Sequence, residues 1–64
     1  MNVRELNQNQ LDQLKQSYLC EIYDENGESP SYGELFWAED NISNEEIYEI
    51  YDNYDFCEED FGVA

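Results

Sequence analysis

The sequence predicts an all-α fold, a three-helix mini-domain with an acidic C-terminal tail, in one domain spanning residues 1–64. Two observations predict this fold. Apolar residues recur at the three- and four-residue spacing that gives a helix one apolar face, and three segments begin with the pattern of a helix N-cap. Because a chain of this length buries only about 60% of its unfolded surface, we expect one small core.

The first helix is expected over about residues 8–23. Asn7 has the position of its N-cap and Gln10 that of the reciprocal partner, while Leu6 and Leu11 form the flanking apolar pair. Its apolar face consists of Leu11, Leu14, Tyr18, Leu19 and Ile22. The segment from Asp24 to Pro30 contains Asn-Gly and a proline, so it predicts a turn that ends the helix.

The second helix is expected over about residues 32–39, because Ser31 and Glu34 fit the capping pattern. Leu35, Phe36 and Trp37 follow as its apolar residues. A glycine inside a helix is unfavourable, so Gly33 predicts close packing against another element.

The third helix is expected over about residues 44–54. Ser43 is its predicted N-cap, with Glu46 at the third helical position and Ile42 packed on Ile47. The predicted apolar stripe is Ile47, Ile50, Tyr51 and Tyr54. Leu14 and Ile50 are placed at the centres of the stripes of the first and third helices. The acidic tail that follows is expected to be extended and held by Phe56 and Phe61.

The charge of the chain is strongly one-sided. Asp and Glu number 17 and Lys and Arg only 2, giving a formal net charge of -15. Such a field repels nucleic acid and anionic membranes and attracts proteins built to hold polyanions. An apolar fraction of 41% and an aromatic fraction of 16% favour a folded domain over a disordered acidic tail. The absence of a secretion signal and of a membrane-spanning run predicts a cytoplasmic protein.

The residue types argue against catalysis. Without histidine the chain has no Ser-His or Cys-His nucleophile pair and no imidazole metal ligand. Cys20 and Cys57 are expected to be reduced, half-buried thiols. We therefore expect neither an enzyme nor a protein with a cofactor.

The turn over residues 24–30 partly matches a calcium-binding loop. Asp24, Asn26 and Glu28 begin like an EF-hand loop. However, Ser29 and Leu35 occupy the positions of the required glycine and of the bidentate glutamate. A hydrophilic turn is the favoured interpretation.

The candidate binding site is a row of carboxylates. Side chains at i and i+4 on a helix lie about 5–6 Å apart, which is close to the spacing of phosphates along one strand of nucleic acid. The row starts with Glu45, Glu49 and Asp52, and the full set of predicted partner-binding carboxylates adds Glu39, Asp40, Glu58, Glu59 and Asp60. The simpler alternative is a solvated acidic surface, although solubility requires a net charge of only about 2 to 8.

Tyr48 is predicted to be the main apolar anchor among these carboxylates, because an apolar centre within a charged rim is the usual anatomy of a tight interface. Tyr23, Tyr32 and Trp37 are other aromatic residues that the sequence allows at the surface.

Several segments resemble a known group of proteins. They are 11–20, 31–35, 42–47 and 56–61, with the sequences LDQLKQSYLC, SYGEL, ISNEEI and FCEEDF. Together they resemble short acidic proteins of phages and conjugative elements of Gram-positive bacteria. In size and charge the chain is also similar to anti-restriction and anti-CRISPR proteins that mimic DNA. These similarities imply an inhibitor of a host nucleic-acid-binding protein.

Two functions are therefore expected as alternatives. In the first, the chain is a nucleic-acid mimic that occupies the basic groove of a DNA- or RNA-binding protein. In the second, it is a small adaptor that docks through an aromatic face, and its charge serves solubility only. Salt separates them, because charge pairing weakens with ionic strength and hydrophobic docking does not.

Overall fold

The computed structural model of the chain describes residues 1–57. It consists of a short 3-10 helix η1 (Val3–Glu5) and three α-helices, α1 (Gln8–Glu25), α2 (Tyr32–Asn41) and α3 (Asn44–Ile50). No strand occurs between residues 1 and 57. The prediction of an all-α fold with three helices is confirmed, while the predicted tail beyond Cys57 lies outside the described residues.

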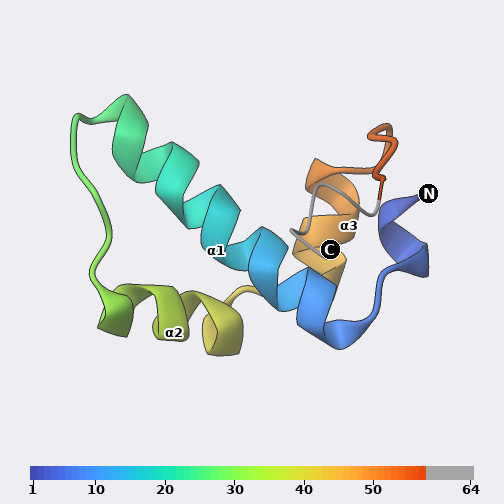
Figure 1. Cartoon of the computed structure of the whole chain (residues 1–64), viewed down its shortest axis with the longest axis horizontal. Coiled ribbons are helices and arrows are strands. Elements are labelled where there is room, and N and C mark those ends of the chain that lie inside the picture. Colours follow the sequence, from blue (N-terminus) through green and yellow to red (C-terminus); the bar gives the residue numbers. More distant parts are fainter. Residues whose placement is uncertain (58–64) are drawn as a thin grey trace.

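The helices are arranged around the N-terminal half of α1. Figure 1 shows α2 returning from the loop after α1 toward the start of α1, and α3 lying at that same end together with η1. The loop contains Gly27 at φ 73°, a backbone conformation that glycine adopts without strain. The two longer helices therefore meet at one end of the molecule, and the loop spans the other end.

The helix starts are those that the sequence predicts. Each N-cap side chain accepts a hydrogen bond from the backbone N–H three residues later, and this satisfies one of the otherwise unpaired donors of the first turn. These pairs are Asn7 with Gln10 at 2.9 Å, Ser31 with Glu34 at 3.3 Å, and Ser43 with Glu46 at 3.2 Å. A further capping pair, Asn2 with Glu5, begins η1. The sequence pattern does not predict η1, because a single turn has no periodicity.

The core lies where α1, α3 and η1 meet and where α2 packs against α1. It consists of Val3, Leu6, Leu11, Leu14, Leu19, Ala38, Ile42, Ile47 and Phe56. The prediction that Leu14 is buried is confirmed, as is the anchoring role of Phe56, which is 5% exposed. The predicted anchor Phe61 lies outside the described residues.

The third helix is shorter than the sequence predicts. It ends at Ile50, and a turn over residues 51–53 reverses the chain so that Phe56 reaches the core. As a result Ile50 is 41% exposed and Tyr54 52% exposed, whereas Ile47 is fully buried. The predicted placement of Ile50 at the centre of the stripe is therefore wrong. Seven residues make only two turns, so the core contact of α3 is concentrated on Ile47.

Two further predictions about packing are wrong. A Cβ built on Gly33 would find only Ser31 Oγ, at 3.9 Å, so this glycine permits no close approach of another element. Ile22 belongs to the predicted apolar face of α1, yet it is 37% exposed. It lies in the C-terminal part of α1, which extends away from the N-terminal junction where α3 and η1 pack (Figure 1).

Lys15 lies in the buried face of α1 and is only 4% exposed. Its Nζ is 3.7 Å from Asp12 Oδ1 and donates to the carbonyl oxygen of Glu39 at 3.4 Å. Glu39 lies in the last turn of α2, where the helix dipole is negative and favours a cation. This lysine thus ties the end of α2 to α1 instead of facing solvent.

The N-terminus is fastened to the chain beyond α3. The α-amino group of Met1 lies 2.8 Å from Asp55 Oδ1 and donates to the carbonyl oxygen of Phe56, and Phe56 N–H donates to the carbonyl oxygen of Met1 at 2.8 Å. The hydrogen bond to Asp55 raises the pKa of the amino group above 8.0, and the same bond lowers the pKa of Asp55 below 3.8. The pair therefore stabilises the folded chain while both groups are charged.

We expect Asp55→Asn to lower the melting temperature at neutral pH. The difference from the parent should vanish as the pH rises through the raised pKa of the amino group, above 8.0, because the neutral amine no longer forms the ion pair. It should also vanish as the pH falls below 3.8 through the lowered pKa of Asp55. Thermal melts followed by circular dichroism measure this, with Asp52→Asn in the neighbouring turn as control. An equal effect of both variants at every pH would refute a specific clamp.

Candidate partner-binding surface

Most carboxylates in the described part of the chain have no intramolecular partner. Between residues 1 and 57 the ion pairs join Asp55 to the N-terminus and Asp12 to Lys15. The exposed carboxylates of this part without a side-chain hydrogen bond or ion pair are Glu21, Asp24, Glu25, Glu28, Asp40, Glu45, Glu46, Glu49 and Asp52. They lie on all three α-helices and on the loops, so the chain has considerable unused capacity to accept cations.

The positive groups of residues 1–57 are already engaged. The amino group of Met1 and the buried ammonium of Lys15 take part in ion pairs. The guanidinium carbon of Arg4 lies 5.0 Å from the centroid of the Tyr48 ring, a cation–π arrangement. A cationic partner would therefore meet little competition from the chain's own side chains.

The structure keeps only part of the predicted carboxylate row. Glu45 and Glu49 are exposed and lie four residues apart on α3, which places them on one face. Asp52 is also exposed, but it follows the end of α3 in the turn and so does not continue this face. The predicted row is interrupted because α3 ends at Ile50, earlier than the sequence predicts.

The predicted extensions of the row differ from one another. Glu39 is half-buried and its carboxylate accepts a hydrogen bond from Gln16 Nε2, so it belongs to the contact between α1 and α2. Asp40, the next residue, is exposed and has no such partner. Glu58, Glu59 and Asp60 lie outside the described residues.

Tyr48 is not the exposed anchor that the sequence predicts. Its side chain is half-buried and packs against the core, and Arg4 lies over its ring. Pairing between Arg4 and Tyr48 depends on a contact of η1 with α3 that the sequence pattern does not show. Tyr23 is also half-buried, and its hydroxyl donates to Glu34.

The exposed aromatic residues are found on α2 instead. Tyr32 is 83% exposed, Phe36 62% and Trp37 56%. On the opposite side of the helix, Leu35 packs against the core and Ala38 is fully buried. The sequence signal for this arrangement was the uninterrupted run of Leu35, Phe36 and Trp37, since a helix buried on one side cannot bury three consecutive residues.

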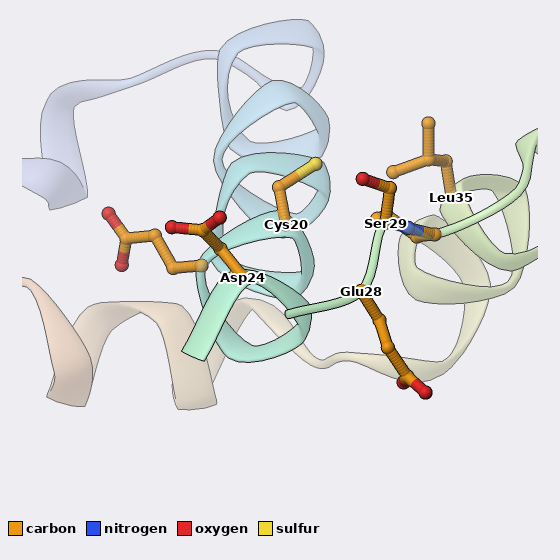
Figure 2. A pocket seen from close by; sticks show the side chains of 7 residues that line it. Cys20, Asp24, Glu28, Ser29 and Leu35 are labelled. Atoms are coloured by element: carbon orange, nitrogen blue, oxygen red, sulfur yellow. The ribbon is translucent and has the colours of Figure 1, made fainter. Parts of the chain in front are cut away.

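A shallow open groove lies between the C-terminal half of α1 and the loop that leads to α2. Its volume is about 410 Å³, and it is lined by Cys20, Glu21, Asp24, Glu28, Ser29, Pro30 and Leu35. Figure 2 shows Cys20 pointing toward Ser29 and Leu35, whereas the carboxylates of Asp24 and Glu28 point in different directions. The groove thus has a small apolar floor and an acidic rim, without two carboxylates converging on one point.

Cys20 and Cys57 are both exposed, so the expectation that they are half-buried is wrong. Within residues 1–57 no cluster of three or more acidic, Cys or His side chains is suited to hold a metal ion. None of the helices in this part is both long and apolar enough to cross a membrane. Comparison of the chain with protein-family models, curated proteins and solved structures gave no match.

Proposed function

We propose that the chain is a nucleic-acid mimic that inhibits a DNA- or RNA-binding protein by occupying its basic groove. The observation that carries this proposal is the set of exposed carboxylates without an intramolecular partner, from Glu21 to Asp52. A basic groove shaped for phosphates would supply the cations that these groups lack.

The alternative is that the charge only confers solubility, and this explains the size of the net charge less well. A net charge of -15 far exceeds the magnitude of about 2 to 8 that solubility requires, and self-repulsion destabilises the compact state. The few positive groups of residues 1–57 are engaged within the fold. A surface that retains so large a repulsion is better explained by a cationic partner that relieves it.

The size and charge of the chain suggest a biological setting for this activity. Anti-restriction and anti-CRISPR proteins of phages and mobile elements inhibit host proteins that bind DNA or RNA, and this chain is similar to those that mimic DNA. We propose a cytoplasmic inhibitor of that type, whose target is a basic host protein.

The adaptor function remains a second candidate because of one observation. Tyr32, Phe36 and Trp37 expose large aromatic surfaces on α2, and aromatic residues are enriched at the centres of protein interfaces. In this alternative the aromatic face supplies the affinity and the carboxylates contribute little.

A comparison of two charge variants tests the mimicry. The immobilised chain captures proteins from a bacterial lysate at low salt, and mass spectrometry identifies those that excess DNA or RNA releases. Against such a protein, changing Glu45 and Glu49 to Gln with Asp52 to Asn should weaken binding by about 1–3 kcal/mol, mainly through slower association. All three residues are exposed, so the fold should persist.

A second triple variant provides the matched control. Changing Glu21 and Glu25 to Gln with Asp24 to Asn removes the same amount of charge. These residues lie at the C-terminal end of α1, away from α3 (Figure 1). If both variants weaken binding equally, Glu45, Glu49 and Asp52 have no special role in binding. Binding that is unchanged between about 0.05 and 0.5 M salt, where screening of exposed charges becomes strong, would favour the adaptor function.

A further inference from the structure

The outward face of α2 combines aromatic rings with one unpaired carboxylate. Asp40 lies four residues after Phe36 and three after Trp37, so the three side chains share one face of the helix. Phe36 is 62% exposed and Trp37 56%, and Asp40 is exposed as well. Tyr32, one turn before Phe36, extends the same face toward the loop.

Asp40 differs from the other acidic residues of α2. Glu34 accepts hydrogen bonds from the Ser31 hydroxyl and from Tyr23, and Glu39 accepts one from Gln16. In the described part of the chain the carboxylate of Asp40 has no such partner. It is therefore available to a group that approaches the aromatic rings from outside.

Charge determines what can cover this face. A second copy of the chain would bring a further net charge of -15, so self-association through α2 is opposed by repulsion. A cationic side chain is attracted both by the carboxylate and by the faces of the rings. Arginine fits better than lysine, because its planar guanidinium stacks on a ring while its N–H groups bond a carboxylate.

The molecule itself contains an example of this contact. Arg4 lies over the ring of Tyr48 with its guanidinium carbon 5.0 Å from the ring centroid. Within residues 1–57 no cation occupies the rings of Phe36 or Trp37 in this way. Tryptophan is the strongest cation–π acceptor among the aromatic residues, so the vacant rings include the most favourable one.

We propose that Phe36, Trp37 and Asp40 form a binding site for an arginine side chain of a basic segment in the partner protein. This inference rests on the proposed function and specifies how the partner is held. An arginine that contacts bases or phosphates in the partner's own nucleic-acid complex would stack on the rings and pair with Asp40. The aromatic face and the acidic surface then act on the same partner.

Binding of hexa-arginine amide tests the site without knowledge of the partner. Because Trp37 is the only tryptophan, its indole N–H resonance reports on the site directly. At low salt we expect a saturable shift of this resonance. Hexa-lysine amide should bind roughly twofold to fivefold more weakly, since an exposed ammonium gains less from a ring.

Matched variants distinguish a specific arginine site on α2 from nonspecific electrostatic attraction of the peptide to the acidic chain. Asp40→Asn and Asp52→Asn make the same chemical change at exposed positions, and Phe36→Ala removes one ring. We expect Asp40→Asn and Phe36→Ala each to weaken hexa-arginine binding by roughly twofold to fivefold, with little effect of Asp52→Asn. Equal effects of the two Asp variants, or equal affinity for arginine and lysine peptides, would overturn the proposal.

The outcome is separable from that of the proposed function. An arginine site that responds as expected in a chain that fails to compete with nucleic acid would support the site and refute mimicry. A chain that competes with nucleic acid and is indifferent to Phe36→Ala and Asp40→Asn would refute the site and leave mimicry intact.

Discussion

Ile47→Ala is expected to abolish the cooperative thermal unfolding transition. Ile47 is fully buried at the centre of the contact between α3 and the core, and truncating a buried isoleucine to alanine costs about 2–5 kcal/mol. A domain of this length has a total stability of the same order. Melts followed by circular dichroism should show a gradual loss of helix where the parent shows a transition.

Ile50→Ala is the matched control, because it removes the same atoms from the same helix three residues later. Ile50 is 41% exposed, so its truncation should lower the melting temperature only slightly. If Ile50→Ala proved as damaging as Ile47→Ala, the end of α3 at Ile50 and the turn after it would be wrong.

Lys15→Glu is expected to unfold the chain. The new carboxylate would lie in a position that is 4% exposed, beside Asp12 and the negative end of α2. A buried charge without an opposite partner costs several kcal/mol. Loss of the helical circular dichroism signal at neutral pH measures this.

Lys15→Met distinguishes the contribution of the Lys15 charge to stability from the contribution of its side-chain volume. Methionine keeps the apolar stem that fills the space between α1 and α2, and the remaining Asp12 is partly exposed and can be solvated. The variant thus leaves no buried charge without a partner, so we expect a melting temperature close to that of the parent. A strong loss of stability would show that the bond to Glu39 outweighs packing. Gln13→Glu, at an exposed position of α1, controls for added negative charge.

The sequence predicts the starts of the helices better than their ends. The helix starts can be predicted from their N-cap residues, because capping depends on neighbours only three residues away in the sequence. These N-cap residues are Asn7, Ser31 and Ser43. The end of α3 depends on Phe56 returning to the core, a contact between distant residues. The periodic pattern of Ile47, Ile50, Tyr51 and Tyr54 continues through the turn and conceals it.

The sequence predicts only those parts of the candidate surface that depend on the pattern within one helix. Exposure of Glu45 and Glu49 follows from helical spacing and from the burial of Ile47. The burial of Lys15 and the cover of Tyr48 by Arg4 depend on contacts between helices, which a pattern within one helix does not contain. For the aromatic face of α2, the sequence allows Tyr32 and Trp37 at the surface, and the run of Leu35, Phe36 and Trp37 is too long to be buried on one side of a helix.

The most direct test of the central claim is whether the chain and nucleic acid exclude each other on one target. A labelled oligonucleotide is bound to a captured basic protein at low salt, and the chain is added in increasing amounts. Mimicry predicts complete displacement, with an apparent dissociation constant for the oligonucleotide that rises in proportion to the chain's concentration. A stable ternary complex in which the target binds both with undiminished affinity would contradict it.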